Sequence, residues 1–213
     1  MKNAFINSYL IALNNRKFMN LAIKITPTKN LPSTAEEREA LLINGCLNEE
    51  RWAQKELYES FYGRMMGICL RYSNNSEDAR DILNEGYVKV FRYLGRYKIG
   101  TSLECWIRRI MINTSIDFYR KEMRHRTDDI EYAQHKIAQD ADAESNFSAK
   151  EILAVIQKLP PCYRAVFNLY AIEGYSHKEV AAALGITEST SRSNLVKARS
   201  KLKEHLKILG IRS

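Results

Sequence analysis

The chain has 213 residues, of which 33 are Lys or Arg and 25 are Asp or Glu, giving a formal net charge of +8. A hydrophobic fraction of 45% is enough to build packed cores and excludes wholesale disorder. Nine Gly and four Pro are too few for a loop-rich β-sandwich. No apolar run approaches the ~18 residues that a membrane span requires, so we expect one or two soluble domains without membrane insertion.

Catalytic and metal-binding motifs are missing from the sequence. The four Cys never form a C-x-x-C pair and the four His show no ligand spacing, which predicts reduced thiols in a cytoplasmic protein and no metal site. There is no Gly-rich phosphate loop, no G-x-S-x-G motif and no carboxylate constellation with an obvious partner. We therefore expect no enzyme activity, no cofactor and no small-molecule substrate.

The first 35 residues carry five positive and no negative side chains. Met1 to Leu13 is mildly apolar, but its charges follow the apolar stretch and no small-residue cleavage site comes after them, which disfavours a signal peptide. We expect residues 1–35 to be a poorly ordered N-terminal extension, with Met19 as an alternative start.

Charge is arranged in blocks along the rest of the chain. The net charge is −5 over residues 36–87, +7 over 88–126, −5 over 127–151 and +5 over 175–213. Two separate basic segments predict two contacts with polyanions, and the acidic block before the first predicts a basic partner that is not nucleic acid. The alternative is that the charges lie on solvent-exposed helix faces, where they serve solubility and bind no partner.

Apolar residues recur at three- and four-residue steps and no convincing alternating strand occurs, so the sequence predicts helices. In chain order they are expected at 49–72, 76–97, from 101 onward, 152–159, 161–174, 177–184 and 187–207. We predict helix caps at Ser76, Thr101 and Ser176. The Thr101 hydroxyl is expected to meet the backbone N–H of Glu104 in a capping box.

Residues 127–148 are polar, acidic and poor in large aliphatic side chains, which is the composition of a linker. The sequence therefore predicts an all-α protein of two small helical domains, residues 36–126 and 149–213, joined by this flexible acidic linker.

Val180-Ala181 followed by Leu184-Gly185-Ile186 and a basic helix is typical of a helix-turn-helix. Ala181 is small enough for a close helix crossing, and Gly185 tolerates the positive φ of the turn. Residues 189–213 carry seven positive side chains and one negative, which suits phosphate contacts. A helical hairpin with a solvated basic face is the alternative, and the polar Ser191 departs from the aliphatic residue that such helices usually have.

Residues 91–126 interleave aromatic rings with Arg and Lys, a combination that holds single-stranded DNA. Phe91 and Trp106 lie on apolar stripes and are expected in the core. The better surface candidates are Tyr97, Tyr119, Arg109 and Arg120.

Two sets of motifs occur along the chain. The first set comprises Asp78 to Glu85, Phe91-Arg92, Leu103 to Thr114 and Asp117 to Arg120. The second comprises Leu159 to Arg164, Glu173 to Ala181, Thr190 to Ser193 and Lys197 to Arg199. They resemble conserved regions 2 and 4 of the extracytoplasmic-function (ECF) class of bacterial sigma factors, in the sigma-70 family. Both sets in this order, separated by a short acidic linker, are specific to the family. The resemblance covers about Leu57 to Leu206, and its departures are Ser189, Ser191 and Asn194.

The resemblance implies a sigma factor that binds core RNA polymerase and directs promoter-specific initiation, including DNA melting. It implies that region 2 binds the polymerase clamp through Asp78, Asp81 and Glu85. It implies that region 2 captures the opened minus-ten element through Lys98, Thr101, Arg109, Asn113, Tyr119 and Arg120. It implies that region 4 reads the duplex minus-thirty-five element through Thr190, Arg192, Ser193, Val196 and Lys197. An anti-sigma factor is a further candidate partner.

Two other functions remain open at this stage. A helix-turn-helix regulator without polymerase binding would need a ligand pocket or a self-complementary apolar face in its first domain. A recombinase would need a Tyr or Ser nucleophile amid clustered Arg and His. The sequence offers Tyr119 beside Arg120, without a group of His residues around them.

Overall fold

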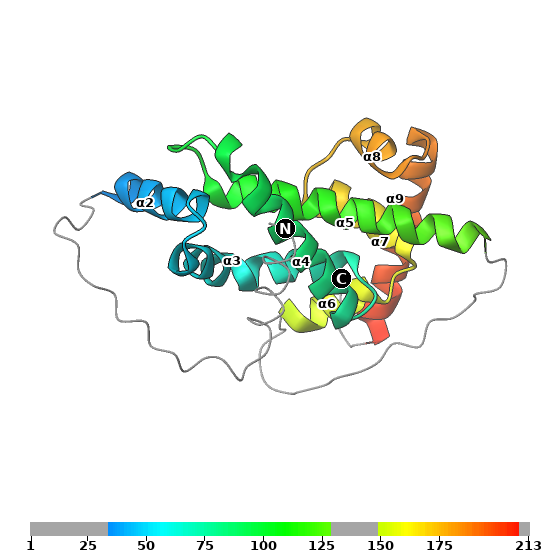
Figure 1. The fold of residues 1–213 in the computed structure, drawn as a ribbon. Coiled ribbons are helices and arrows are strands. Elements are labelled where there is room, and N and C mark those ends of the chain that lie inside the picture. The colour runs from blue at the N-terminus through cyan, green and yellow to red at the C-terminus, as the bar shows by residue number, and fades with distance from the viewer. Residues whose placement is uncertain (1–33, 129–148, 209–213) are drawn as a thin grey trace. The chain divides into compact units, whose positions relative to one another are not determined.

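The structure is a computed structural model that describes residues 34–128 and 149–208. Within these ranges every regular element is a helix (Figure 1), which confirms the predicted all-α class. The predicted N-terminal extension (1–35) lies outside the described residues except for residues 34 and 35. The predicted linker (127–148) lies outside them except for residues 127 and 128.

The elements follow one another in chain order as three groups. The first contains α2 (Ala35–Leu47), α3 (Arg51–Tyr72), α4 (Ser76–Tyr93) and a 3₁₀ turn η2 (Leu94–Arg96). The second is the long helix α5 (Leu103–Asp128). The third contains α6 (Ala149–Gln157), α7 (Pro161–Phe167), a π-helical turn η3 (Asn168–Ile172), α8 (His177–Leu184) and α9 (Glu188–Ile208).

Packing divides the chain into two compact units. Unit 1 contains the residues up to Met65 together with Leu83–Met111, and unit 2 contains Met66–Ile82 together with Ile112–Ser213. The division passes through α3, α4 and α5, so the C-terminal end of α3 belongs to the same unit as α6 to α9. The two domains expected from the sequence, residues 36–126 and 149–213, do not coincide with these packing units, and their bounds stay a prediction.

Unit 1 is centred on Tyr87, which is fully buried. Its ring packs 4.5 Å from that of Tyr58, and its hydroxyl donates to the Tyr58 carbonyl at 3.2 Å, so burial of the polar group is compensated. The other fully buried side chains of this unit include Leu57, Met65, Leu83, Val90, Leu94, Ile107 and Met111. They occupy the stripes that the helical periodicity predicts.

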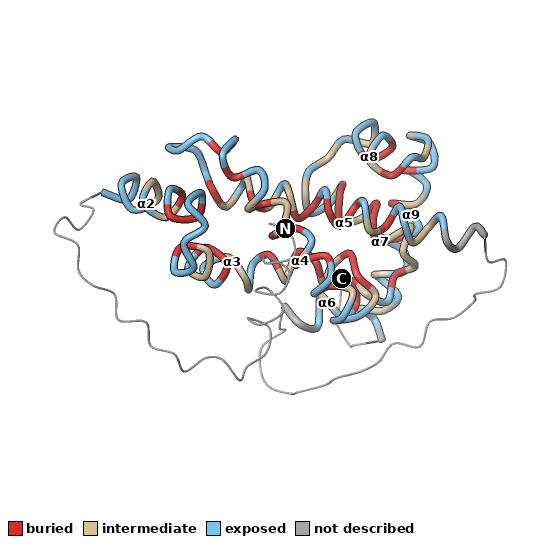
Figure 2. Tube along the Cα trace, in the orientation of Figure 1, coloured by how far each residue is buried: buried red, intermediate tan, exposed pale blue. Residues whose placement is uncertain are grey.

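Unit 2 holds the helix-turn-helix. Gly185 adopts φ +68°, and the backbone N–H of Ile186 donates to the Ala181 carbonyl at 3.1 Å, which ends α8 and redirects the chain. Buried Val180 and Leu184 on α8 face a core that also contains Leu195 and Ala198 of α9. Figure 2 shows the same segregation along α5, where buried and exposed positions alternate.

Two of the three predicted helix caps are wrong by one residue. The cap of α4 is Asn75, whose Oδ1 accepts from the Asp78 backbone N–H at 2.8 Å. The cap of α5 is Ser102, which accepts from the Cys105 N–H at 3.2 Å, while the Thr101 hydroxyl donates backward to the Lys98 carbonyl at 2.7 Å. In both places two adjacent polar residues could have capped, and only the backbone conformation decided between them.

The capping box at Ser176 is confirmed. Its hydroxyl accepts from the Glu179 N–H at 3.2 Å, and its own N–H donates to the Glu179 carboxylate at 2.8 Å. An equivalent box of Thr34 and Glu37 begins α2, a helix that the sequence analysis did not identify.

Gly45 of α2 lies too close to α3 to carry a side chain. A Cβ atom at Gly45 would lie 2.7 Å from the Ala53 Cβ and 3.0 Å from the Trp52 ring. Gly45→Ala should therefore lower the free energy of unfolding by about 1–3 kcal/mol, because overpacking forces the two helices apart.

Gly63→Ala is the matched control for that substitution. A Cβ atom there meets nothing within 4 Å, so the better helix propensity of Ala should raise stability by about 0.5–1 kcal/mol. Urea unfolding followed by circular dichroism measures both variants, and equal stability of Gly45→Ala and wild type would contradict this packing.

Candidate nucleic-acid interface

An acidic surface lies along α4. Asp78, Asp81 and Glu85 follow one another at steps of three and four residues and so share one helix face. Asp81 and Glu85 are exposed, and Asp78 is half-buried. Burial, together with the nearby Glu122 carboxylate, raises the pKa of Asp78 above its ordinary value. The Asp81 and Glu85 end of this face is therefore the part that is open to a basic partner.

A polar and basic surface lies along α5. Arg109, Asn113 and Arg120 are all exposed, and their spacing of four and seven residues places them on one face. The Arg120 guanidinium also donates to the Ala182 carbonyl of α8 at 3.0 Å, within unit 2.

The loop before α5 is held by Tyr97. Its hydroxyl lies 2.7 Å from Glu39 Oε1 and 2.5 Å from the Thr101 carbonyl oxygen, and its ring packs on Trp106. Gly100, at φ +86°, turns the backbone so that Lys98 and Thr101 are exposed. The loop is thus a supported structure that presents a cation and a hydroxyl beside the start of α5.

The prediction that Tyr97 and Tyr119 lie on the surface is wrong, because each is only 8% exposed. Tyr119 continues the buried stripe of Ile112 and Ile116 at four- and three-residue steps, and that spacing could have revealed its position. Tyr119 is one of the six residues assigned to the minus-ten element. Its buried ring is not available to stack on a DNA base.

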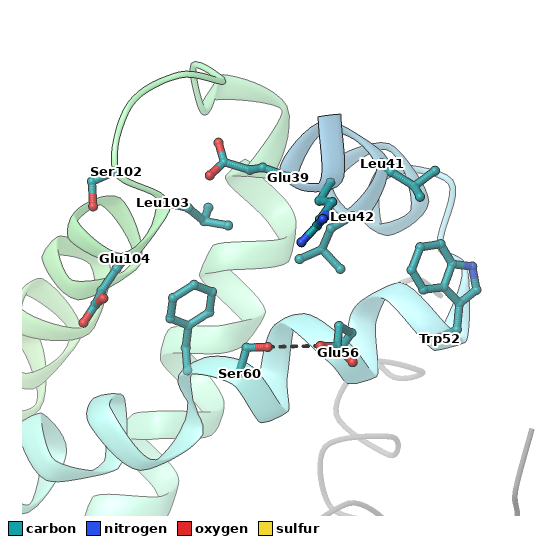
Figure 3. A pocket seen from close by; sticks show the side chains of 11 residues that line it. Glu39, Leu41, Leu42, Trp52, Glu56, Ser60, Ser102, Leu103 and Glu104 are labelled. Atoms are coloured by element: carbon teal, nitrogen blue, oxygen red, sulfur yellow. Dashed lines mark hydrogen bonds between the residues drawn. The ribbon is translucent and has the colours of Figure 1, made fainter. Parts of the chain in front are cut away.

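A pocket of about 510 Å³ opens beside this loop in unit 1. Figure 3 shows Trp52 from α3, Leu42 and Glu39 from α2, Ser102 from the loop, and Leu103 and Glu104 from the start of α5 around it. Phe61 of α3 also lines the pocket. Its walls are apolar, and Glu39, Glu56 and Glu104 supply carboxylates against the single guanidinium of Arg38. Such a lining suits an uncharged planar group better than a phosphate.

The outer face of α9 contains the residues expected to read duplex DNA. Thr190, Arg192, Ser193, Val196 and Lys197 are all exposed, whereas Ser191, Leu195 and Ala198 are buried. Val196 is 66% exposed, which is unusual for an aliphatic side chain and suits contact with a thymine methyl group.

Intramolecular contacts hold two of the α9 side chains in place. Arg192 pairs with Glu188 one turn earlier at 3.1 Å, and the Lys197 ammonium lies 6.0 Å from the Tyr163 ring centre. An exposed i,i+4 pair of this kind contributes only about 0.3–0.5 kcal/mol, so Arg192 is readily released to a ligand.

Ser191, the polar departure in α9, has a specific partner. Its hydroxyl lies 2.9 Å from Nδ1 of His177, whose ring stacks on Tyr170 with centroids 4.3 Å apart. The sequence analysis did not identify His177 and Tyr170 as supports of α9, and the polar Ser191 was the only sign that a polar partner existed. The contact fixes the first turn of α9 against α8.

The described ranges contain no group of three or more His, Cys, Asp or Glu side chains that could hold a metal ion. Among the helices in the described ranges, none has the length and apolar character needed to cross a membrane.

Two family models match the chain: Sigma-70 region 2 over residues 57–125 and Sigma-70, region 4 over residues 149–202. The chain belongs to the sigma-70 family of RNA polymerase sigma factors. The region 2 match contains the α4 and α5 surfaces, and the region 4 match contains the helix-turn-helix.

Named relatives confirm the resemblance to the ECF class. The chain is 31% identical over 156 residues to the ECF RNA polymerase sigma factor SigE of Mycolicibacterium smegmatis, a match that spans 71% of this chain and 60% of that relative. It is 26% identical over 167 residues to the ECF RNA polymerase sigma factor SigM of Mycobacterium tuberculosis, spanning 78% and 84% of the two chains. A solved structure of the Bartonella quintana sigma factor RpoE with the anti-sigma factor NepR gives a TM-score of 0.49 at 20% identity, over 72% and 96% of the chains.

The reactivity of the four cysteine thiols tests how deeply this sigma factor fold buries each of them. Burial raises the pKa of the Cys46 and Cys69 thiols to about 12, so both stay protonated and unreactive at neutral pH. Cys105 is exposed and Cys162 half-buried. We expect a maleimide to label Cys105 first, then Cys162, and the other two only after denaturation. Mass spectrometry of peptides over a time course measures this order, which early labelling of Cys69 would contradict.

Proposed function

We propose that this protein is an alternative sigma factor that binds core RNA polymerase and directs promoter-specific transcription initiation, including promoter recognition and melting. The observation that carries the proposal is the order of three surfaces along one chain that matches regions 2 and 4. They are an acidic face on α4, a basic face on α5 and an exposed reading face on α9. In this role the protein is a non-enzymatic initiation factor that acts in the cytoplasm, and an anti-sigma factor is a further proposed partner.

The α4 surface is the proposed polymerase contact. Asp81 and Glu85 are exposed on one face and carry charge of the sign that a basic coiled coil requires. Glu85 also pairs with Lys89 at 2.9 Å, which keeps its carboxylate on the surface. Asp78, being half-buried, is proposed to contribute at the edge of the contact.

The α5 surface is the proposed site of the opened minus-ten strand. Arg109 and Arg120 offer cations to phosphates, and Asn113 between them offers an amide that can pair with a base edge. Lys98 and Thr101 extend the surface across the loop. The adjoining pocket, with the Phe61 and Trp52 rings at its walls, is the proposed receptor for an unstacked base.

The α9 surface is the proposed reader of the duplex minus-thirty-five element. A helix in the major groove contacts base edges through its exposed N-terminal residues, here Thr190, Arg192 and Ser193. Val196 and Lys197 follow one turn later. Lys197 can meet either a base or a phosphate.

The alternative of a helix-turn-helix regulator is separated from the proposal by one experiment. The purified chain is mixed with core polymerase, isolated by size exclusion and assayed for promoter-dependent run-off transcription. A sigma factor forms the complex and initiates at a defined start site, whereas a regulator binds the duplex without forming the complex.

Charge reversal on α4 tests the polymerase contact. Asp81→Lys combined with Glu85→Lys should weaken binding to core polymerase about tenfold or more, because both ends of the contact become repulsive. Glu59→Lys, an exposed reversal on α3, is the control and should leave the affinity unchanged. Titration of labelled protein with core polymerase measures the affinity of the wild type, the double variant and the control variant. Circular dichroism verifies that each of them stays helical. Unaltered affinity of the double variant would remove α4 from the interface.

Two promoter templates separate the roles of the DNA-binding surfaces. Arg192→Ala should cost about 1–3 kcal/mol of affinity on any template if its guanidinium contacts a base. Asn113→Ala and Arg120→Ala should instead impair opening, so a template already unpaired across the minus-ten element should restore part of their activity. Run-off transcription on duplex and pre-opened templates measures the difference. Identical behaviour of all three variants on both templates would contradict the assignment of duplex reading to α9 and of DNA opening to α5.

A further inference from the structure

A carboxylate lies at the start of the basic α9 surface. The acidic residues of α9 are Glu188, in the first turn, and Glu204, near the other end of the helix. The helix dipole favours a carboxylate in the first turn, and this end of a recognition helix is the part that enters the major groove. A carboxylate there repels phosphates, so the general attraction of a basic helix for DNA does not explain Glu188.

Glu188 and Arg192 form one donor–acceptor unit on this surface. Glu188 Oε2 accepts from Arg192 Nη2 at 3.1 Å, and the two side chains are 43% and 61% exposed. The residues are one turn apart, so they share a row along the helix that Val196 continues. The exposed pair therefore carries N–H donors and acceptor oxygens side by side.

The neighbouring hydroxyl groups of the α9 surface are bonded within the helix end itself. Thr187 Oγ1 accepts from the Thr190 backbone N–H at 3.1 Å and lies 2.8 Å from the Thr190 hydroxyl oxygen. The Ser193 hydroxyl donates to the Thr190 carbonyl at 3.1 Å. A guanidinium and a carboxylate each have several hydrogen-bonding positions, so the charged pair keeps more capacity for a base than these hydroxyls do.

The major-groove edge of a G·C base pair is complementary to the Glu188–Arg192 pair. Guanine offers the acceptors O6 and N7, and cytosine offers its N4 amino donor beside O6. The base-pair hydrogen bond joins O6 and N4 at about 2.9 Å, close to the 3.1 Å between Arg192 Nη2 and Glu188 Oε2. Arg192 can therefore donate to guanine while Glu188 accepts from cytosine, and the two side chains need not separate.

We propose that Glu188 and Arg192 together read one G·C base pair of the duplex element, with Glu188 as a specificity-determining residue. An A·T pair offers Arg192 one purine acceptor in place of two, and a reversed C·G pair places guanine acceptors against the carboxylate. Glu188 also repels phosphates, which weakens binding to unrelated duplex. The inference rests on the proposed role of α9 as a duplex reader and adds the base pair that it reads.

Selection from a randomised duplex library tests this assignment in the full chain, with and without core polymerase. The wild type should enrich a site in which one position strongly prefers G·C. Glu188→Ala and Arg192→Ala should each lower the preference at that same position about five- to tenfold, as expected for a lost base contact. The double variant should lower it no further, because the two side chains act as one unit.

Two further variants separate a base contact from a purely structural role of Glu188. Glu188→Gln keeps an acceptor oxygen at the same distance from the backbone, so it should retain more of the G·C preference than Glu188→Ala. It should also bind unrelated duplex more tightly, because the charge is gone. Glu204→Ala removes the other carboxylate of α9 and should leave every base preference unchanged. Circular dichroism verifies that each variant stays helical.

Several results would overturn this assignment. They are relaxation of different positions by Glu188→Ala and Arg192→Ala, an unchanged preference in Glu188→Ala, and equal loss in Glu188→Gln and Glu188→Ala. Enrichment of no sequence in either arm would overturn it together with the role of α9 as duplex reader. Relaxation of one shared G·C position without binding to core polymerase would uphold the assignment and reject the sigma function. Promoter-specific run-off transcription by the wild type, with an unchanged preference in Glu188→Ala, would do the reverse.

Discussion

Backbone groups at helix ends, which no helix can satisfy by itself, are the constraint on which this structure depends. An all-helical chain of short elements has many such ends relative to its length. At the N-terminal ends, side-chain oxygens of Thr34, Asn75, Ser102 and Ser176 accept from the exposed N–H groups. At the end of α3 the Ser73 hydroxyl reaches the Leu70 carbonyl at 3.5 Å, and side chains from the distant third group of helices supply further donors. Helix capping therefore organises the long-range contacts as well as the local ones.

The same constraint positions the surfaces proposed for DNA and polymerase. The Asn75 cap determines where α4 begins and hence which face contains Asp81 and Glu85. The Ser102 cap and the bend at Gly100 determine how the loop before α5 is presented. In each place a short polar residue ends a loop and fixes the rotation of the helix that follows, which aligns every exposed side chain on it.

Helix α9 illustrates how one element meets two requirements. Its inner face packs Leu195 and Ala198 into the core of unit 2, and its outer face keeps Val196 and Lys197 in solvent. Ser191 joins the inner face although it is polar, because His177 of α8 lies within hydrogen-bond distance of its hydroxyl. A buried polar contact of this kind is directional, so it defines the orientation of α9 more narrowly than an aliphatic residue could.

The sequence by itself determined the helical class, the helix-turn-helix with its Gly185 turn, the capping box at Ser176 and the exposed face of α9. These features follow from periodicity and local backbone chemistry, which operate over a few residues. The tertiary structure alone decided the capping of α4 by Asn75, the burial of Tyr97 and the contacts at the end of α3. Neighbouring polar residues compete equally for a cap, an aromatic ring suits a core and a surface alike, and a donor such as Arg164 lies some ninety residues from its acceptor. Such outcomes depend on which segments meet in space, and a linear pattern does not contain that information.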